Sequence, residues 1–417
     1  MTRTFRLIVL LAALAPGLSS ATSAPLESVE LTELARRVLA THPSAEAARA
    51  EIAAARSELS GSQWARFPGV MVESFADGRR GGDVSASLVL EQPLWSGGLI
   101  SANIRLSQAR LDAAVARLDE VYLDLALRTV QAYVDLLSLR RRVRILEDSL
   151  EEHYKLVDSM RRRVEQQVSP AAELRLAESR ARQTESEVLQ ARAAAEVALV
   201  QLRELAGDES LEITAQLIFR HEQHSIDRQE LVRAALRFDP QRRRIDAEAD
   251  IASAEVAVRK SDLMPKLAAQ YVHRLSDGND LDDQLGLVVR FQADGGLSRV
   301  SAISAARQRE RAALLAVQTA GREHRERVMS ELARHESALL QVQAGREAAL
   351  AAQSVTESFL RQFSAGRRTW PEVLNAVREA VTARLIQVEA EASAMSSYLR
   401  LMLLSGRWQP GAGESNP

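Results

Sequence analysis

The residues best suited to chemistry in this sequence are two closely spaced histidines and two pairs of glycines. His221 and His224 have a spacing found in metal sites, but no third ligand follows nearby, so a structural or solvent-exposed role is favoured. The glycine pairs at 97–98 and 295–296 lack the following lysine of a phosphate-binding loop. No Ser-His-Asp, Cys-His or paired-carboxylate arrangement can be placed on a common site. The sequence therefore predicts a protein that is not an enzyme and that uses no metal or cofactor.

Three arginine triplets, at 140–142, 161–163 and 242–244, raise the question of nucleic-acid binding. Acidic residues are interleaved near each triplet, which favours solvated helix faces. The whole chain has 54 Lys and Arg against 56 Asp and Glu, a net charge of −2. This near-neutral balance argues against nucleic acid as the main partner. Residues 161–163 lie close to an expected helix end, where they can meet a partner protein.

The N-terminus has the pattern of a secretory signal peptide over residues 1–24. Two arginines precede an apolar run at 7–14, which ends in small residues. We expect cleavage after Ala21 or Ala24, and the first is favoured because the second leaves a proline at the new N-terminus. No other segment reaches the ~20 apolar residues of a membrane-spanning helix. The absence of cysteine excludes a disulfide scaffold and lipid attachment through an N-terminal cysteine.

The rest of the sequence consists of two similar units in tandem. Four landmarks recur in the same order, displaced by 197 to 199 residues: His42-Pro43 as Asp239-Pro240, Phe67-Pro68 as Met264-Pro265, Ser96–Leu99 as Asp294–Leu297, and Leu205–Gly207 as Leu404–Gly406. A duplication explains this order better than chance does. We therefore expect a first structural repeat over 25–215, a second over 216–408, and a flexible tail over 409–417.

Both repeats have the same order of periodicities. Two short helices are separated by a residue–proline step, which disfavours helical geometry before the proline. Two strands with alternating apolar and polar residues follow, and then a long helix and a return helix. The expected helix pairs are 29–41 with 44–64 and 227–237 with 240–262; the strands are about 70–75, 84–91, 267–275 and 285–292; the long helices are about 99–164 and 298–362; the return helices are about 171–206 and 371–405.

The first long helix carries a coiled-coil seam. Fourteen of sixteen heptad positions between 111 and 164 are apolar, and the exceptions are Thr129 and His153. A helix of that length extends on the order of 100 Å. The four strands, each with one apolar face, allow a small sheet packed on helices, a soluble sandwich or part of a membrane barrel. Membrane strands must close into a barrel of at least ~8 strands, so several chains would have to pool them. A soluble periplasmic scaffold is the alternative.

The duplicated units, the segment Gln92–Gly98 and the turn Phe363–Ala376 resemble the TolC-like outer-membrane efflux protein family over nearly all of the mature chain. The resemblance implies a mainly α fold with a small β part. In a homotrimer, the duplicated helical hairpins would form a periplasmic α-barrel, and four strands per chain would contribute to a shared 12-stranded outer-membrane β-barrel. It implies a cell outer-membrane location extending into the periplasm, among outer-membrane lipid. The implied protein partners are a periplasmic adaptor (membrane fusion) protein and an inner-membrane ABC transporter or proton-driven pump.

The family's periplasmic gate maps onto the second helical turn. Glu372 keeps one of the two acidic rings that the family has, and three such carboxylates are expected to favour cations and raise one another's pKa. Asn375 removes the second ring. Phe363 replaces the usual tyrosine, so a family hydrogen bond is lost, and we expect Arg368 to pair instead with Glu173 of the first turn.

The adaptor is expected to dock on both helical turns. The docking residues are Gln167, Val168, Ser169, Gly366, Arg367 and Trp370. The first turn lacks the family's glycine, with Gln167 or Val168 in its place. The segment 365–376 is also similar to outer-membrane components of type I secretion systems, which favours export of large adhesin or RTX-type proteins over multidrug or metal efflux. Since the glycine, arginine and tryptophan occur only in the second turn, we expect the second hairpin to be the moving gate.

Overall fold

The computed structural model describes residues 26–76, 84–219, 227–275, 283–291 and 298–411. The expected signal peptide, His221, His224, the second glycine pair and the last six residues lie outside these ranges. Twelve elements are found in the described residues: eight helices and one four-stranded sheet.

The helices follow the duplication. The first repeat contains α1 (Leu26–Thr41), α2 (Pro43–Trp64), α3 (Leu99–Glu165) and α4 (Ala171–Ala206); the second contains α5 (Arg228–Arg237), α6 (Pro240–Ser261), α7 (Ser298–Ser364) and α8 (Trp370–Leu404). At each residue–proline step a helix begins at the proline, and the residue before it caps the helix. His42 accepts a hydrogen bond from the amide of Ser44, and Asp239 accepts one from the amide of Arg242.

The sheet has the order β1-β2-β3-β4, antiparallel throughout, with β1 (Gly69–Ala76), β2 (Val84–Trp95), β3 (Lys266–Leu275) and β4 (Gln284–Arg290). The central β2–β3 pair joins the two repeats. Strand β2 runs four residues beyond the expected end at 91. It passes Pro93, and the register shifts between Pro93 and Trp95, which is how a strand accommodates a residue without an N–H donor.

The joint between β2 and α3 depends on glycine. Gly97 and Gly98 have φ values of 59° and 87°, in the left-handed region that other residues rarely adopt. A Cβ on Gly97 would lie 2.2 Å from Cβ of Met264, at the start of the second repeat's sheet segment. The first glycine is therefore needed both for its backbone angle and for a close approach between the repeats.

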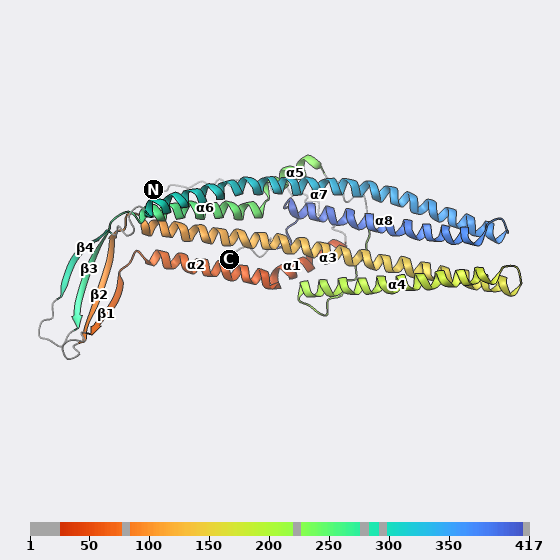
Figure 1. The fold of residues 1–417 in the computed structure, drawn as a ribbon, viewed down its shortest axis with the longest axis horizontal. Helices are drawn as coiled ribbons and strands as arrows, with labels where there is room; N and C mark the ends of the chain where they lie inside the picture. Colours follow the sequence, from red (N-terminus) through yellow and green to blue (C-terminus); the bar gives the residue numbers. More distant parts are fainter. Residues whose placement is uncertain (1–25, 77–83, 220–226, 276–282, 292–297, 412–417) are drawn as a thin grey trace, which may run out of the picture.

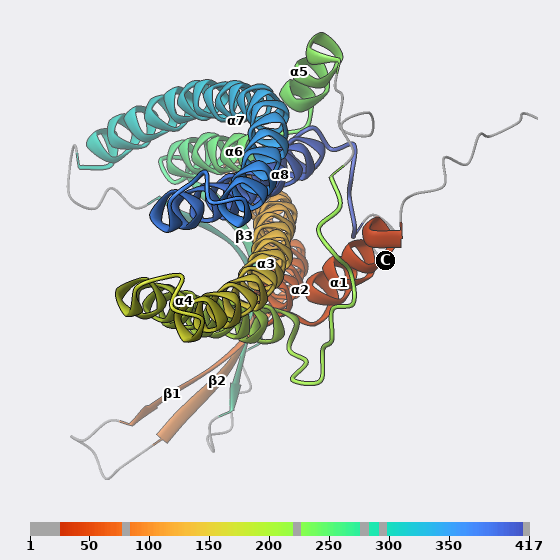
Figure 2. The same cartoon turned by 90° about the vertical axis from the view of Figure 1, so that its right-hand side faces the viewer.

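The four longest helices run along the molecule as two hairpins, α3 with α4 and α7 with α8, whose turns lie side by side at the end opposite the sheet (Figure 1). Viewed along the long axis, these helices form an arc, and α1, α5 and the C-terminal end lie on its convex side (Figure 2). No helix in the described ranges has a stretch that is both long and apolar enough to cross a membrane.

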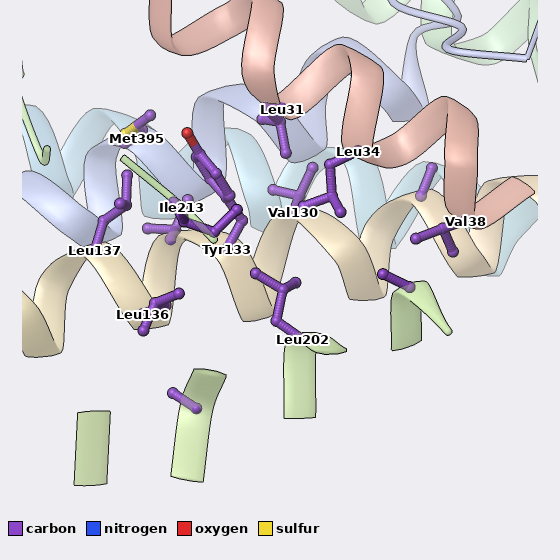
Figure 3. Packing of buried hydrophobic residues seen from close by; sticks show 14 of the residues in the cluster. Leu31, Leu34, Val38, Val130, Tyr133, Leu136, Leu137, Leu202, Ile213 and Met395 are labelled. Atoms are coloured by element: carbon purple, nitrogen blue, oxygen red, sulfur yellow. The ribbon is translucent and has the colours of Figure 1, made fainter. Parts of the chain in front are cut away.

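The largest core lies halfway along the molecule, where α1, α3, α4 and the segment after α4 meet (Figure 3). Tyr133 is fully buried there, and its hydroxyl donates to the carboxylate of Glu30 at 3.3 Å. The same carboxylate accepts from the amides of Thr214 and Ala215. The connection between the repeats is thus held against the first repeat by one buried cluster and one carboxylate.

Candidate functional site

The two helical hairpins end in the same backbone turn. The amide of Val168 donates to the carbonyl of Arg163 at 2.8 Å, and the amide of Arg367 donates to the carbonyl of Gln362 at 2.9 Å. Each bond closes a Schellman motif. In this motif the residue before the donating amide must have a left-handed backbone conformation. That residue is Gly366 in the second turn, with φ 72°, and Gln167 in the first, with φ 60°. Gln167, rather than Val168, therefore occupies in the first turn the position that Gly366 has in the second.

A polar network organises the second turn around Glu372. One carboxylate oxygen accepts from both the amide and the hydroxyl of Thr369, each at 2.8 Å, and the other accepts from Arg368 at 2.7 Å. This is a capping box at the start of α8. The Thr369 amide, then its hydroxyl, then Arg368 lower the pKa of Glu372 to about 2. This lowering holds for the single chain, in which both carboxylate oxygens accept hydrogen bonds. The raised pKa expected when three such carboxylates meet in a trimer stays a prediction.

Arg368 is held within its own turn. Its guanidinium pairs with Glu372, donates to the side-chain oxygen of Gln362 at 3.1 Å and lies 4.2 Å from the ring centre of Phe359. Glu173 lies in the first turn of α4 and is half-buried. The pairing of Arg368 with Glu173 stays a prediction.

Trp370 supports the turn from inside. It is 1 % exposed, and its ring centre lies 5.1 Å from that of Phe363. The cluster around it joins all four long helices at their ends, through residues such as Met160, Ala177 and Leu374. The expectation that Trp370 offers a docking surface is wrong for its side chain, because a large apolar ring at this position fills the space between the hairpins.

The other predicted docking residues are at the surface or near it. Gln167, Arg367 and Gly366 are exposed, and the side chain of Val168 is 61 % exposed. Ser169 is half-buried and accepts a hydrogen bond from Arg163 at 3.2 Å. Asn375 is exposed on α8, one turn beyond Glu372.

The sequence placed Arg163 near the end of the first hairpin but did not predict its contact with the second hairpin. Besides its bond to Ser169, its guanidinium lies 4.8 Å from the ring centre of Phe363, so it links the first hairpin to the second. The two residues are 200 positions apart, and no local sequence pattern predicts the contact.

Across the described ranges, no three His, Asp or Glu side chains are grouped as a metal site would require.

At the opposite end, the sheet has one mainly apolar face and one face on which polar and apolar residues are mixed. The register places Val70, Leu90, Tyr271 and Leu285 in one row. On this face the side chains of β4 are open, with Leu285 80 % and Leu287 69 % exposed.

The other face carries polar groups, among them a pair in which Arg290 donates to Glu91 at 2.7 Å. Within the described residues, β1 and β4 each pair on one side only. The sheet therefore leaves an apolar face and two strand edges open.

Comparisons with known proteins agree with this arrangement. Residues 34–208 match the family model for outer membrane efflux protein. A search of curated proteins gives no match. Among solved structures, CusC, described for transmembrane channel formation, is similar with a TM-score of 0.81 at 14% identity, covering 90% of this chain and 92% of that one.

Two further structures are similar along most of their length. The outer membrane protein VceC from Vibrio cholerae has a TM-score of 0.77 at 16% identity, covering 91% of this chain and 96% of its own. The open state of the MtrE outer membrane channel from Neisseria gonorrhoeae has a TM-score of 0.77 at 15% identity, covering 90% and 88%. At such identities these likenesses establish the fold.

The sequence match covers the first repeat, and the shared fold extends through the second. Proteins of this kind are transport channels rather than enzymes, and they span the outer membrane and the periplasm. The chain thus has a first repeat that matches the outer membrane efflux protein family and, over nearly all of its length, the fold of the outer-membrane channels.

Proposed function

We propose that three copies of this chain close into one passive duct, in which twelve strands form an outer-membrane barrel and the helices form a tube across the periplasm. The observation that carries the proposal is the open sheet, which has an exposed apolar face and, within the described ranges, unpaired outer edges on β1 and β4. In lipid an open edge leaves backbone groups without partners, and a barrel needs at least ~8 strands. TolC-like channels function as trimers, and three sheets of four strands meet this requirement.

The helices suit the same assembly. α3 and α7 each contain 67 residues, about 100 Å, and both run from the sheet to the turns. Large apolar side chains stand open on α4 and α7, including Leu189, Leu340 and Leu350, which are 60–70 % exposed. A neighbouring copy that covers these faces in head-to-tail order generates a closed ring.

The turns are the proposed contact with the rest of the export machinery. TolC-like channels work with periplasmic adaptors and inner-membrane pumps. We place the adaptor contact on Val168 and Arg367, which are exposed at the ends of the two hairpins, with the arginines at 161–163 beside them. Trp370 acts indirectly, by holding the turns in place.

The proposed cargo is a large adhesin or RTX-type protein, exported by a type I secretion system with an inner-membrane ABC transporter. The sequence similarity of 365–376 to outer-membrane components of such systems supports this assignment. The competing function is the outer-membrane channel of a multidrug or metal efflux pump. Neighbouring genes separate the two, because a large repetitive secreted protein beside an ABC transporter favours secretion, whereas a proton-driven pump favours efflux.

Two experiments test the proposal at its two levels. The duct requires the protein to fractionate with outer membranes as a heat-resistant trimer and to conduct ions in a planar bilayer; a soluble monomer would overturn it. The secretion assignment requires that deleting the gene abolish release of the large protein and leave drug and metal tolerance unchanged. Loss of tolerance with normal secretion would establish the efflux function instead.

The proposed gate is the second hairpin, with the first as the more fixed wall. Arg368, Thr369 and Glu372 form a compact network at the start of α8, and Glu173 faces the same end of the molecule from α4. Opening requires the second turn to move away from its neighbours. In the closed trimer we place Arg368 within reach of Glu173.

A further inference from the structure

A pocket of about 730 Å³ lies where the two repeats meet, far from both the turns and the sheet. Its walls come from α1, α3, the α5–α6 junction and the segment after α8, through Leu39, Tyr122, Phe238 and Trp408. Pockets for small molecules usually enclose 300–1,000 Å³ and have mainly apolar walls with a few polar groups. The size and the lining of this pocket are those of a ligand site.

The residues that line the pocket are fixed in place by contacts with one another and with neighbouring residues. Gly406, with φ 67°, ends α8 and turns the chain back over the pocket, and a Cβ there would lie 2.6 Å from Phe238. Pro410 is buried, and the hydroxyl of Tyr122 accepts from Arg49 at 3.1 Å. The aromatic rings are therefore positioned by the fold, so that a ligand need not order them.

The polar groups of the pocket have a net positive charge. Asp119 and Arg243 pair at 3.1 Å, and the Arg243 guanidinium lies 5.7 Å from the ring centre of Phe238. Arg237 is exposed and forms no ion pair within the part of the chain that the structure describes. Two guanidinium groups and one carboxylate leave a charge of about +1, which favours an anionic ligand.

α1, α5 and the C-terminal end lie on the convex side of the arc of long helices (Figure 2). The pocket is lined from α1, from the end of α5 and from the segment after α8, as well as from α3. A ligand there would not occupy the hollow side of the arc. It would bridge the first repeat, through α1 and α3, to the second, through the α5–α6 junction and the end of α8.

The geometry points to a binding site for an anionic amphiphile, a small molecule with a flat apolar body between Tyr122, Phe238 and Trp408 and an acidic group that pairs with Arg237. The site does not depend on the proposed cargo. It assigns to this chain a ligand that binds beside the duct rather than passing through it.

Equilibrium dialysis of the full chain in lipid nanodiscs tests the site, with empty nanodiscs as the blank. The probes are naphthalene-2-sulfonate and naphthalene-2-sulfonamide, which share the ring system and differ in charge. We expect saturable binding of one sulfonate per chain and about tenfold weaker binding of the sulfonamide. Equal affinity for both probes, or no saturable binding of the sulfonate, would overturn the proposal.

Two variants locate the bound probe. Arg237→Gln should weaken sulfonate binding about tenfold and leave sulfonamide binding unchanged. The matched control is Arg233→Gln, one turn earlier on α5, where the exposed arginine bonds to the carbonyl of Gln229. Ala234→Phe, which fills the pocket, should abolish binding of both probes. Equal losses in the two arginine variants, or normal binding in the filled variant, would refute this location.

Discussion

Replacing Gln167 with glycine should stabilise the first helical turn. Gln167 is the only non-glycine residue with a positive φ in the described ranges, at 60°. A side chain in the left-handed region crowds its own carbonyl, which costs roughly 1–2 kcal/mol. Glycine removes that cost, but it also increases the conformational entropy of the unfolded chain, which lowers the free energy of unfolding by about 0.4–1 kcal/mol. The midpoints of the two ranges differ by about 0.8 kcal/mol, which is the expected net gain.

The gain is local and needs a local measurement. Hydrogen exchange followed by mass spectrometry reports the opening of the turn through the amide of Val168, which bonds to the carbonyl of Arg163 at 2.8 Å. A gain of about 0.8 kcal/mol should slow exchange in the peptide covering 163–171 about two- to fivefold. Exchange in the second turn should not change.

The second turn provides the reverse experiment. Gly366→Gln places a glutamine where φ is 72°, and a Cβ there meets no atom within 4 Å. The backbone angle alone then decides the effect, and exchange in this turn should accelerate by a similar factor. If Gln167→Gly leaves exchange unchanged while Gly366→Gln accelerates it, Gln167 is not strained and the reasoning fails.

Three further predictions concern the second turn. Arg368→Ala should raise single-channel conductance by releasing Glu372, whereas Arg367→Ala, which alters an exposed neighbour, should not; unchanged conductance in the first variant removes the gate role. The pKa of Glu372 is lowered from 4.5 to about 2, so its carboxylate stabilises the turn fully above pH 4.5 and loses this effect as the pH falls toward 2. Conductance of the native protein should therefore rise as the pH falls from 4.5 to 2. Conductance of Glu372→Gln should not change over the same interval. Trp370→Ala should lower the free energy of unfolding by about 3–5 kcal/mol and speed hydrogen exchange in both turns. Trp370→Phe should cost much less, because the indole nitrogen has no hydrogen-bond partner among the residues that the structure describes; equal effects would contradict this.

Most of the fold could be predicted from the duplicated sequence pattern. Proline and glycine mark where helices start and stop whatever surrounds them, so α4 is found at Ala171–Ala206, where 171–206 was expected. The strand faces follow from a period of two, and the register places Val70, Leu90 and Leu285 in one row. The least accurate boundary is the end of β2, because a proline reads as a stop although a bulge lets the strand continue to Trp95.

The sequence by itself determined the repeat, the helix lengths, the alternating strands and the position of the turns, because these depend on interactions between near neighbours along the chain. Only the tertiary structure decided what each turn residue does. Trp370 is buried because four helix ends meet around it, and Arg163 contacts Phe363 across 200 positions. The pocket beside α5 likewise exists only where the C-terminal segment folds back over the first repeat. Contacts between segments far apart leave no periodic pattern, so the sequence predicted which residues stand at the site but not which of them face a partner.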